Sequence, residues 1–214
     1  MENILTFDRL LEISGFALGI IYLWYEYHAS ARMWVVGIIM PMISTYVYYS
    51  AGLYADMMMA IYYIIIAVYG FVSWKFLRNR AGTVSDTGKT NKKELPITKI
   101  SCKTAICAVL WFCPIYALIA WWLVDFTNST VPYLDAFTTA ASIIGSWLLA
   151  KKYLEQWLVW IVVDAVTSGL LIYKDRPFYA VLYGLYTIIA VAGYLKWKKL
   201  MKSQNNGLDS VKAS

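Results

Sequence analysis

The stretch Tyr63-Ile-Ile-Ile-Ala-Val-Tyr-Gly70 occurs again 123 residues later, as Tyr186-Thr-Ile-Ile-Ala-Val-Ala-Gly193. The same offset relates three pairs of tryptophans, which are Trp24 and Trp147, Trp34 and Trp157, and Trp74 and Trp197. An apolar composition produces chance matches between Ile and Val, but matched Trp and Gly residues at one constant offset are much harder to obtain by chance. We therefore predict that the chain contains one structural unit twice.

The composition is that of an integral membrane protein. Of the 214 residues, 60% are hydrophobic and 15% are charged, whereas a soluble domain has about 45–50% apolar and about 25% charged residues. A spanning helix needs roughly 20 apolar residues. Seven apolar runs fit this length, at residues 11–27, 34–51, 55–74, 105–124, 136–150, 157–173 and 178–195. We expect an all-α fold with seven transmembrane helices.

The offset places these helices in a 3+1+3 arrangement. We assign residues 1–78 to the first three-helix repeat, 79–130 to a cytoplasmic linker and the connecting fourth helix, 131–198 to the second repeat and 199–214 to a cytoplasmic tail. Four crossings separate equivalent helices, so the two repeats point the same way. Parallel repeats of this kind occur in transporters that hold a substrate near the membrane midplane. A duplicated scaffold without transport activity is the alternative.

Basic residues indicate the orientation in the membrane. Sixteen Lys and Arg residues fall on the side of the C-terminus, against three on the side of the N-terminus, which are Arg9, Lys174 and Arg176. The positive-inside rule then places the N-terminus outside and the C-terminus in the cytoplasm. The net charge of +6 is explained by topology and contact with anionic lipid, and we expect no nucleic-acid partner.

Span six carries the strongest candidates for a binding site. Trp157, Trp160 and Asp164 are spaced i, i+3 and i+7, which places them on one side of a helix. An ionisable group inside a span is costly and by default functional. Two indoles beside a carboxylate suit a flat, cationic, aromatic ligand. The alternative is that the tryptophans belong to the interfacial belt and that Asp164 pairs with another helix.

Other polar and aromatic side chains are weaker candidates for the same cavity. They are Trp34, Tyr62, Ser142, Ser146, Tyr183 and Tyr186. Ser side chains also mediate helix packing in membranes, and a tyrosine stripe is often packing, so both interpretations stay open. The chain has one histidine, three clustered cysteines, no phosphate-binding loop and no GxSxG motif. We therefore expect no cofactor, no metal site, no catalytic residues and no enzyme activity.

The motif Lys151-Lys-Tyr-Leu-Glu-Gln-Trp-Leu-Val-Trp-Ile-Val-Val-Asp164 resembles the signature of the PnuC-like vitamin transporters. Three motifs of the first repeat resemble that family too, namely Trp34-x2-Gly37, Leu53-Tyr54-Ala55 and Tyr69-Gly70-x3-Trp74. The resemblance implies a seven-helix fold related to the SWEET proteins, a homotrimer in the bacterial inner membrane and facilitated uptake of an unphosphorylated B-vitamin. It also implies that a cytoplasmic kinase traps the product, and that Trp157, Trp160, Asp164 and Tyr183 occupy motif positions.

The chain departs from the riboside carriers of this family at three positions. They have Gln at Ala60, Asn at Ala67 and Asn at Asp164. Each lost hydrogen-bond partner for a buried hydroxyl should cost about 1–3 kcal/mol. We therefore expect a member of the thiamine-type PnuT subfamily, with thiamine slightly preferred. Nicotinamide riboside is the alternative substrate, and a non-transporting scaffold or receptor subunit is the more distant alternative.

Overall fold

The computed structural model describes residues 18–50, 52, 54–76 and 95–212. The chain divides into two compact units, Met1–Leu95 and Pro96–Ser214, and each unit is treated by itself. The predicted start of the first span at residue 11 and most of the predicted linker lie outside the described residues. The connecting helix four, which we assigned with the linker, belongs to the second unit.

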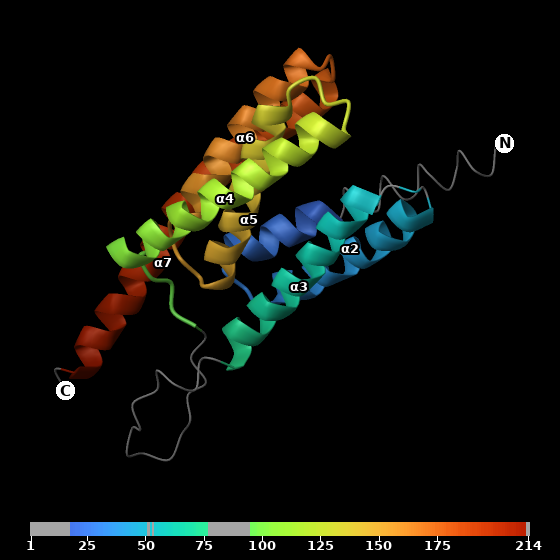
Figure 1. The fold of residues 1–214 in the computed structure, drawn as a ribbon. Coiled ribbons are helices and arrows are strands. Elements are labelled where there is room, and N and C mark those ends of the chain that lie inside the picture. The colour runs from blue at the N-terminus through green and yellow to red at the C-terminus, as the bar shows by residue number, and fades with distance from the viewer. Residues whose placement is uncertain (1–17, 51, 53, 77–94, 213–214) are drawn as a thin grey trace. The chain divides into compact units, whose positions relative to one another are not determined.

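The first unit contains helical residues 18–27 and the helices α2 (Arg32–Ser50) and α3 (Tyr54–Phe76) (Figure 1). Helices α2 and α3 pack against each other. The aromatic pair Trp34 and Trp74 joins them, with ring centroids 5.6 Å apart at an interplanar angle of 88°. Both indoles are almost completely buried, so this pair forms the core of the first unit.

The second unit contains α4 (Cys102–Phe126), α5 (Pro132–Ala150), α6 (Gln156–Tyr173) and α7 (Pro177–Lys212). Helix α5 packs against α4 on one side and α6 on the other, and α6 packs against α7. Helix α7 extends beyond α5 and α6 toward the C-terminus (Figure 1). The segment from residue 199, predicted as a tail, is therefore helical up to Lys212.

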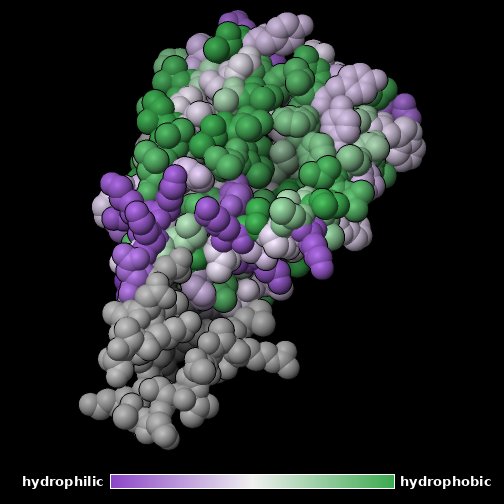
Figure 2. Space-filling model, turned by 90° about the vertical axis from the view of Figure 1, so that its left-hand side faces the viewer, coloured by the Kyte–Doolittle hydropathy of each residue, from purple (hydrophilic) through white to green (hydrophobic). Residues whose placement is uncertain are grey.

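Among the described residues, five helices are long and apolar enough to cross a membrane: α2, α3, α4, α6 and α7. Figure 2 shows hydrophobic residues over most of the visible face. Helix α5 has the predicted length of a span, but small and polar side chains lower its hydropathy, and nine of its 19 residues are buried. Because its neighbours α4 and α6 cover it, it needs less apolar surface for lipid than they do.

In the first repeat, helical residues 18–27 are followed by a turn that contains a residue in the left-handed backbone conformation. The Ala29 N–H donates to the Glu26 carbonyl at 2.9 Å, and the Ser30 N–H donates to the Tyr25 carbonyl at 2.9 Å. Ala29 has a φ of 52°. This pair of hydrogen bonds around a left-handed residue is the Schellman pattern that satisfies the last carbonyls of a helix.

The second repeat has the same turn, 123 residues further on. The Lys152 N–H donates to the Leu149 carbonyl at 2.8 Å, and the Tyr153 N–H donates to the Leu148 carbonyl at 3.1 Å. Lys152 has a φ of 60°. Ala and Lys avoid this conformation, so its occurrence at both equivalent positions confirms that the two repeats share one backbone design.

The turn between the second and third helices of each repeat is also shared. Gly52 has a φ of 71° and Asp175, its equivalent, has a φ of 54°. The Gly52 N–H donates to the Tyr49 carbonyl at 3.2 Å, and the Asp175 N–H donates to the Ile172 carbonyl at 3.1 Å. The duplication seen in the sequence therefore extends to both turns.

A short segment after the linker is attached to the turn between α5 and α6. Thr98 forms an isolated parallel bridge with Tyr153. The Thr98 N–H donates to the Lys152 carbonyl at 3.3 Å, and the Leu154 N–H donates to the Thr98 carbonyl at 2.9 Å. The neighbouring Ile97 is almost completely buried, so both its side chain and this backbone pairing fix the segment to the second unit.

Two side chains hold this segment at its ends. The Ile97 N–H donates to Oε1 of Gln204 at 3.1 Å, and the Ile100 N–H donates to Oε2 of Glu155 at 2.9 Å. Gln204 lies on the extension of α7, and Glu155 directly precedes α6. The segment is thereby attached to the start of α6 and to the C-terminal part of α7.

Candidate functional site

Three of the residues predicted to bind a ligand lie together between α6 and α7. The Asp164 carboxylate is close enough to the phenol groups of Tyr183 and Tyr186 to interact with both electrostatically. The two tyrosine rings meet edge to face, with centroids 5.6 Å apart at 71°. Asp164 is buried, whereas both tyrosines are half-buried. A buried carboxylate beside two aromatic rings is the arrangement expected for a cationic aromatic ligand.

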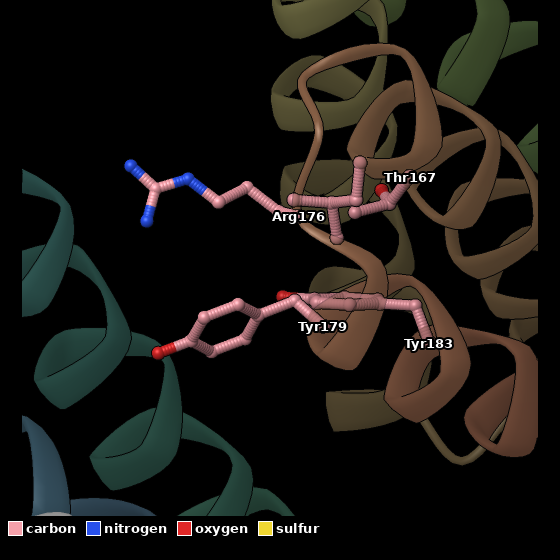
Figure 3. Close-up of a pocket in the computed structure, with 5 residues that line it drawn as sticks. Thr167, Arg176, Tyr179 and Tyr183 are labelled. Carbon is pink, nitrogen blue, oxygen red and sulfur yellow. The ribbon is translucent and has the colours of Figure 1, made fainter.

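A cavity of about 340 Å³ opens next to these residues, at the α6–α7 turn. It is lined by Thr167, Leu171, Arg176, Tyr179 and Tyr183 (Figure 3). Its volume falls in the range of roughly 300–1,000 Å³ that is usual for small-molecule sites, but it is widely open and does not enclose a ligand. Figure 3 shows Arg176 and Tyr179 extending in the same direction, while Thr167 and Tyr183 lie further back in the wall.

The cavity continues the side of α6 on which Asp164 lies. Thr167 and Leu171 follow Asp164 at i+3 and i+7, so the three residues share one face of the helix. Tyr183 belongs to the cavity wall and also interacts with Asp164. The cavity and the buried carboxylate are therefore neighbours that share Tyr183.

Trp160 faces a different neighbour, α5. A Cβ built on Gly145 would lie 3.5 Å from the Trp160 ring, which shows that the indole packs over this glycine. The ring is half-buried, and among the described residues its Nε1–H group has no hydrogen-bond partner. The indole therefore retains an unused donor.

In the first repeat the aromatic ring and the glycine are exchanged. Gly37 is the equivalent of Trp160, and Tyr22 is the equivalent of Gly145. A Cβ built on Gly37 would lie 3.1 Å from the Tyr22 ring. In both repeats, an aromatic ring packs against a glycine at this contact. In the second repeat the ring is that of Trp160 on α6, the helix that carries Asp164, whereas in the first repeat it is that of Tyr22.

Trp157 and Trp34 lie in helix–helix contacts. The Trp157 ring covers Gly193 and meets Trp197 edge to face, with centroids 5.7 Å apart. Trp34 packs over Gly70 in the same way. Both indoles are at most 2% exposed. Packing alone explains these two tryptophans, and their predicted role in binding stays a prediction.

The serines of α5 make hydrogen bonds within their own helix. The Ser142 hydroxyl donates to the Thr138 carbonyl at 2.8 Å, and the Ser146 hydroxyl donates to the Ser142 carbonyl at 2.8 Å. Both serines are buried on either side of Gly145, the glycine under Trp160. Tyr62 lies in the first unit, where its ring contacts that of Tyr63 with centroids 5.5 Å apart. The roles proposed for these three side chains are not tested by this geometry.

Of the five residues that line the cavity, only Tyr183 was among the predicted ligand groups, whereas Thr167, Leu171, Arg176 and Tyr179 were not. Thr167 and Leu171 follow from the helical spacing to Asp164. Arg176 entered only the count of basic residues, and its place in the cavity wall depends on how α6 turns into α7. Among the described residues, no group of three His, Cys, Asp or Glu side chains could hold a metal ion.

These observations define a multi-pass α-helical membrane protein with a duplicated three-helix unit, and its second repeat carries a candidate small-molecule site. Residues 9–199 match the family described as Nicotinamide mononucleotide transporter. The chain belongs to this family. The fold class predicted from the sequence and the resemblance to PnuC-like transporters are thereby confirmed.

Individual proteins support the same assignment. The Nicotinamide riboside transporter PnuC of Neisseria mucosa is 28% identical over 176 residues, which cover 79% of this chain but 64% of the relative. The Nicotinamide riboside transporter PnuC of Escherichia coli is 20% identical over 170 residues, covering 71% of this chain and 69% of the relative. The chain thus spans less than two thirds of the length of the Neisseria relative.

A solved structure is also similar, with a TM-score of 0.67 and 25% identity over 94% of this chain and 85% of the other. Its description is "Crystal structure of the Vitamin B3 transporter PnuC". The relatives and this structure are transporters and not enzymes. The predicted multi-pass membrane location is confirmed, whereas the orientation of the termini stays a prediction.

Proposed function

We propose that this protein is a facilitative importer of nicotinamide riboside. The observation that carries the proposal is the buried carboxylate of Asp164 beside Tyr183 and Tyr186, next to a cavity of suitable volume. The pyridinium ring of nicotinamide riboside is flat and cationic, so a carboxylate and aromatic rings complement it. The relatives named as nicotinamide riboside transporters support this substrate.

The preference for thiamine that we derived from the sequence has no support in the comparisons, which favour the alternative substrate. That preference assumed that Ala67 marks a lost contact with a ribose hydroxyl. A Cβ built on Gly37 would lie 3.9 Å from the Ala67 side chain. This is an ordinary van der Waals contact, and Ala67 is buried, so its small side chain can also be explained by the packing of α2 on α3.

The remaining parts of the proposal concern mechanism and assembly. Trp160 would stack on the ring of the substrate, and a conformational change would expose the site alternately to the two sides of the membrane. The N-terminus would be outside and the C-terminus in the cytoplasm. A homotrimer in the bacterial inner membrane and a cytoplasmic kinase that phosphorylates the imported vitamin would complete the uptake system, as the family resemblance implies.

Uptake into proteoliposomes without an ion gradient tests this function. We expect nicotinamide riboside to equilibrate across the membrane faster than in protein-free liposomes. Calorimetry on the purified protein should give heat with nicotinamide riboside and at least tenfold weaker binding of thiamine. Tighter binding of thiamine than of nicotinamide riboside would show that thiamine is the preferred substrate. Well-folded protein that binds neither compound would support a non-transporting scaffold.

A further inference from the structure

A polar side chain at the start of α6 is buried without a hydrogen bond. Gln156, the first residue of this helix, is completely buried, and its neighbours Leu154 and Trp157 are almost as inaccessible. Within the described part of the chain, neither the amide oxygen nor the amide nitrogen of Gln156 has a hydrogen-bond partner. The amide can donate two hydrogen bonds and accept two. It therefore lies in the protein interior with its hydrogen-bonding capacity unused.

The first repeat shows that this position does not require a polar residue. Met33 is the equivalent of Gln156 at the offset of 123, and it is also completely buried. Both side chains are unbranched with three rotatable bonds, but only the amide loses hydrogen bonds with water when it is buried. A buried amide without partners destabilises the conformation that contains it. Gln156 therefore destabilises the conformation described here, relative to a methionine at the same place.

Helix α5 has a hydrogen-bond acceptor close to this amide. Gln156 and Trp160 are spaced i and i+4, so they lie on the same side of α6. Trp160 packs over Gly145, the residue next to Ser146 on α5. Because a short turn makes α5 and α6 antiparallel, Ser146 lies about one helical turn from Gln156. The buried Ser146 hydroxyl donates to the Ser142 carbonyl at 2.8 Å, so its oxygen can still accept a hydrogen bond.

We propose that Gln156 is a switch residue of the transport cycle. Its amide has no partner in the conformation described here, and it donates to the Ser146 hydroxyl in the conformation that opens the site to the other side of the membrane. This inference rests on the proposed function, because only a carrier that alternates between two conformations needs such a switch. The hydrogen bond that is lost in one conformation and made in the other keeps the first from dominating the equilibrium.

The substitution Gln156→Met places the residue of the first repeat in the second and tests the switch in the full-length protein. The unfolding midpoint in detergent should rise, since a buried amide without partners is removed. The rate of nicotinamide riboside uptake into proteoliposomes at saturating substrate should fall about 5- to 100-fold, since the equilibrium shifts toward the conformation described here. The Kd from calorimetry should stay within about twofold of wild type, because Gln156 acts on the conformational change and not on the substrate.

Leu158→Met is the matched control, because it introduces the same side chain at an exposed position of α6. Its unfolding midpoint and its uptake rate should both equal those of wild type. A lower midpoint in Gln156→Met would show that the amide stabilises this conformation, and a wild-type uptake rate would show that it does not affect the cycle. A Kd that rises as strongly as the rate falls would assign Gln156 to substrate binding. Each of these three results would overturn the proposal.

Ser146→Ala tests the proposed partner of the amide. It removes the acceptor and should also slow uptake, and the double variant with Gln156→Met should be no slower than the slower single variant, because both changes remove the same hydrogen bond. Losses that multiply in the double variant would show that the two residues act separately, against the proposed pairing. Wild-type protein that neither binds nor transports nicotinamide riboside would instead contradict the proposed function itself.

Discussion

The indole of Trp157 occupies the place that a side chain on Gly193 would need. A Cβ built on Gly193 would come within 2.6 Å of ring atom Cη2 of Trp157, a distance that real Cβ atoms do not adopt. Trp34 and Gly70 stand in the same relationship in the first repeat. A large ring pressed against helix backbone needs a glycine opposite, so each repeat depends on one Trp–Gly contact for its closest helix pair.

Gly193→Ala should therefore destabilise the protein. The added methyl group forces α6 and α7 apart or moves a buried indole that has no free space, and overpacking of this kind costs typically about 1–3 kcal/mol. Thermal unfolding of the detergent-solubilised protein, followed by size-exclusion chromatography after heating, measures the effect. The expected result is a clearly lower unfolding midpoint.

Gly169→Ala is the matched control for this variant. Gly169 is an exposed residue of α6, and among the described atoms nothing lies within 4 Å of the Cβ that it would gain. Alanine favours helix over glycine by about 1 kcal/mol, so the control should be as stable as wild type or slightly more stable. An equal loss of stability in both variants would contradict the Trp–Gly explanation.

Asp164→Ala should weaken the binding of nicotinamide riboside far more than Asp164→Asn. Alanine removes both the charge and the hydrogen-bonding group, and hydrogen bonds to a charged group are worth about 1.5–3 kcal/mol, or roughly 10- to 100-fold in affinity. Asparagine keeps the shape and a polar group, so its loss should be smaller. Calorimetry and liposome uptake measure both variants.

The control for the Asp164 variants is Asp125→Asn. Asp125 is an exposed carboxylate at the end of α4, and α4 packs against α5 but not against α6 or α7 in the described structure. Its loss of charge should leave affinity unchanged. If Asp164→Ala binds and transports like wild type while it folds normally, Asp164 is a structural residue and the proposed site is wrong.

The duplicated scaffold could be predicted from the sequence because Trp and Gly are rare enough to align unambiguously. The backbone conformation of its turns could not be predicted from the sequence, because Ala29 and Lys152 adopt a left-handed conformation that neither residue type favours. Only the hydrogen bonds required at the helix ends explain these two residues. A repeat is visible in residue identities, whereas its turns are set by backbone geometry.

The candidate site was predictable in part for a similar reason. The spacing of Trp157, Trp160 and Asp164 indicated one side of a helix, but it could not show which neighbour each residue meets. In the structure Trp157 and Asp164 face α7, whereas Trp160 faces α5. The position of Arg176 in the cavity wall is set by the turn after α6. It could not be predicted, because the helical periodicity of the sequence does not continue through a turn.

The ion pair between Lys174 and Asp135 should contribute little stability. Nζ of Lys174 lies 2.8 Å from both Asp135 oxygens, and the Ser129 hydroxyl donates to Oδ2 of Asp135 at 2.6 Å. The two charged side chains are about one third exposed, and exposed ion pairs are worth about 0.2–1 kcal/mol. Lys174→Met should lower the unfolding midpoint slightly, and the difference from wild type should shrink as salt is added.

A double-mutant cycle with Lys174→Met and Asp135→Asn isolates the ion pair from other effects of each change. The expected coupling energy is below about 1 kcal/mol. Ser129→Ala serves as a companion variant, because it removes a hydrogen bond of Asp135 and leaves both charges in place. A large coupling that does not depend on salt would show that this end of α5 is shielded from solvent, against the exposure seen here.

The segment around Thr98 should control the mobility of the turn between α5 and α6. Thr98→Pro removes the N–H that donates to the Lys152 carbonyl, while Thr98→Ala keeps it, so the pair separates the backbone hydrogen bond from the side chain. Amide hydrogen exchange measured by mass spectrometry should rise in residues 151–155 in the proline variant and stay at the wild-type level in the alanine variant. The effect should reach Leu154, because its N–H donates back to Thr98 and loses protection when the bridge opens. Unchanged exchange in the proline variant would mean that Ile97, Glu155 and Gln204 hold the segment without the bridge, and increased exchange in both variants would assign the effect to the threonine side chain.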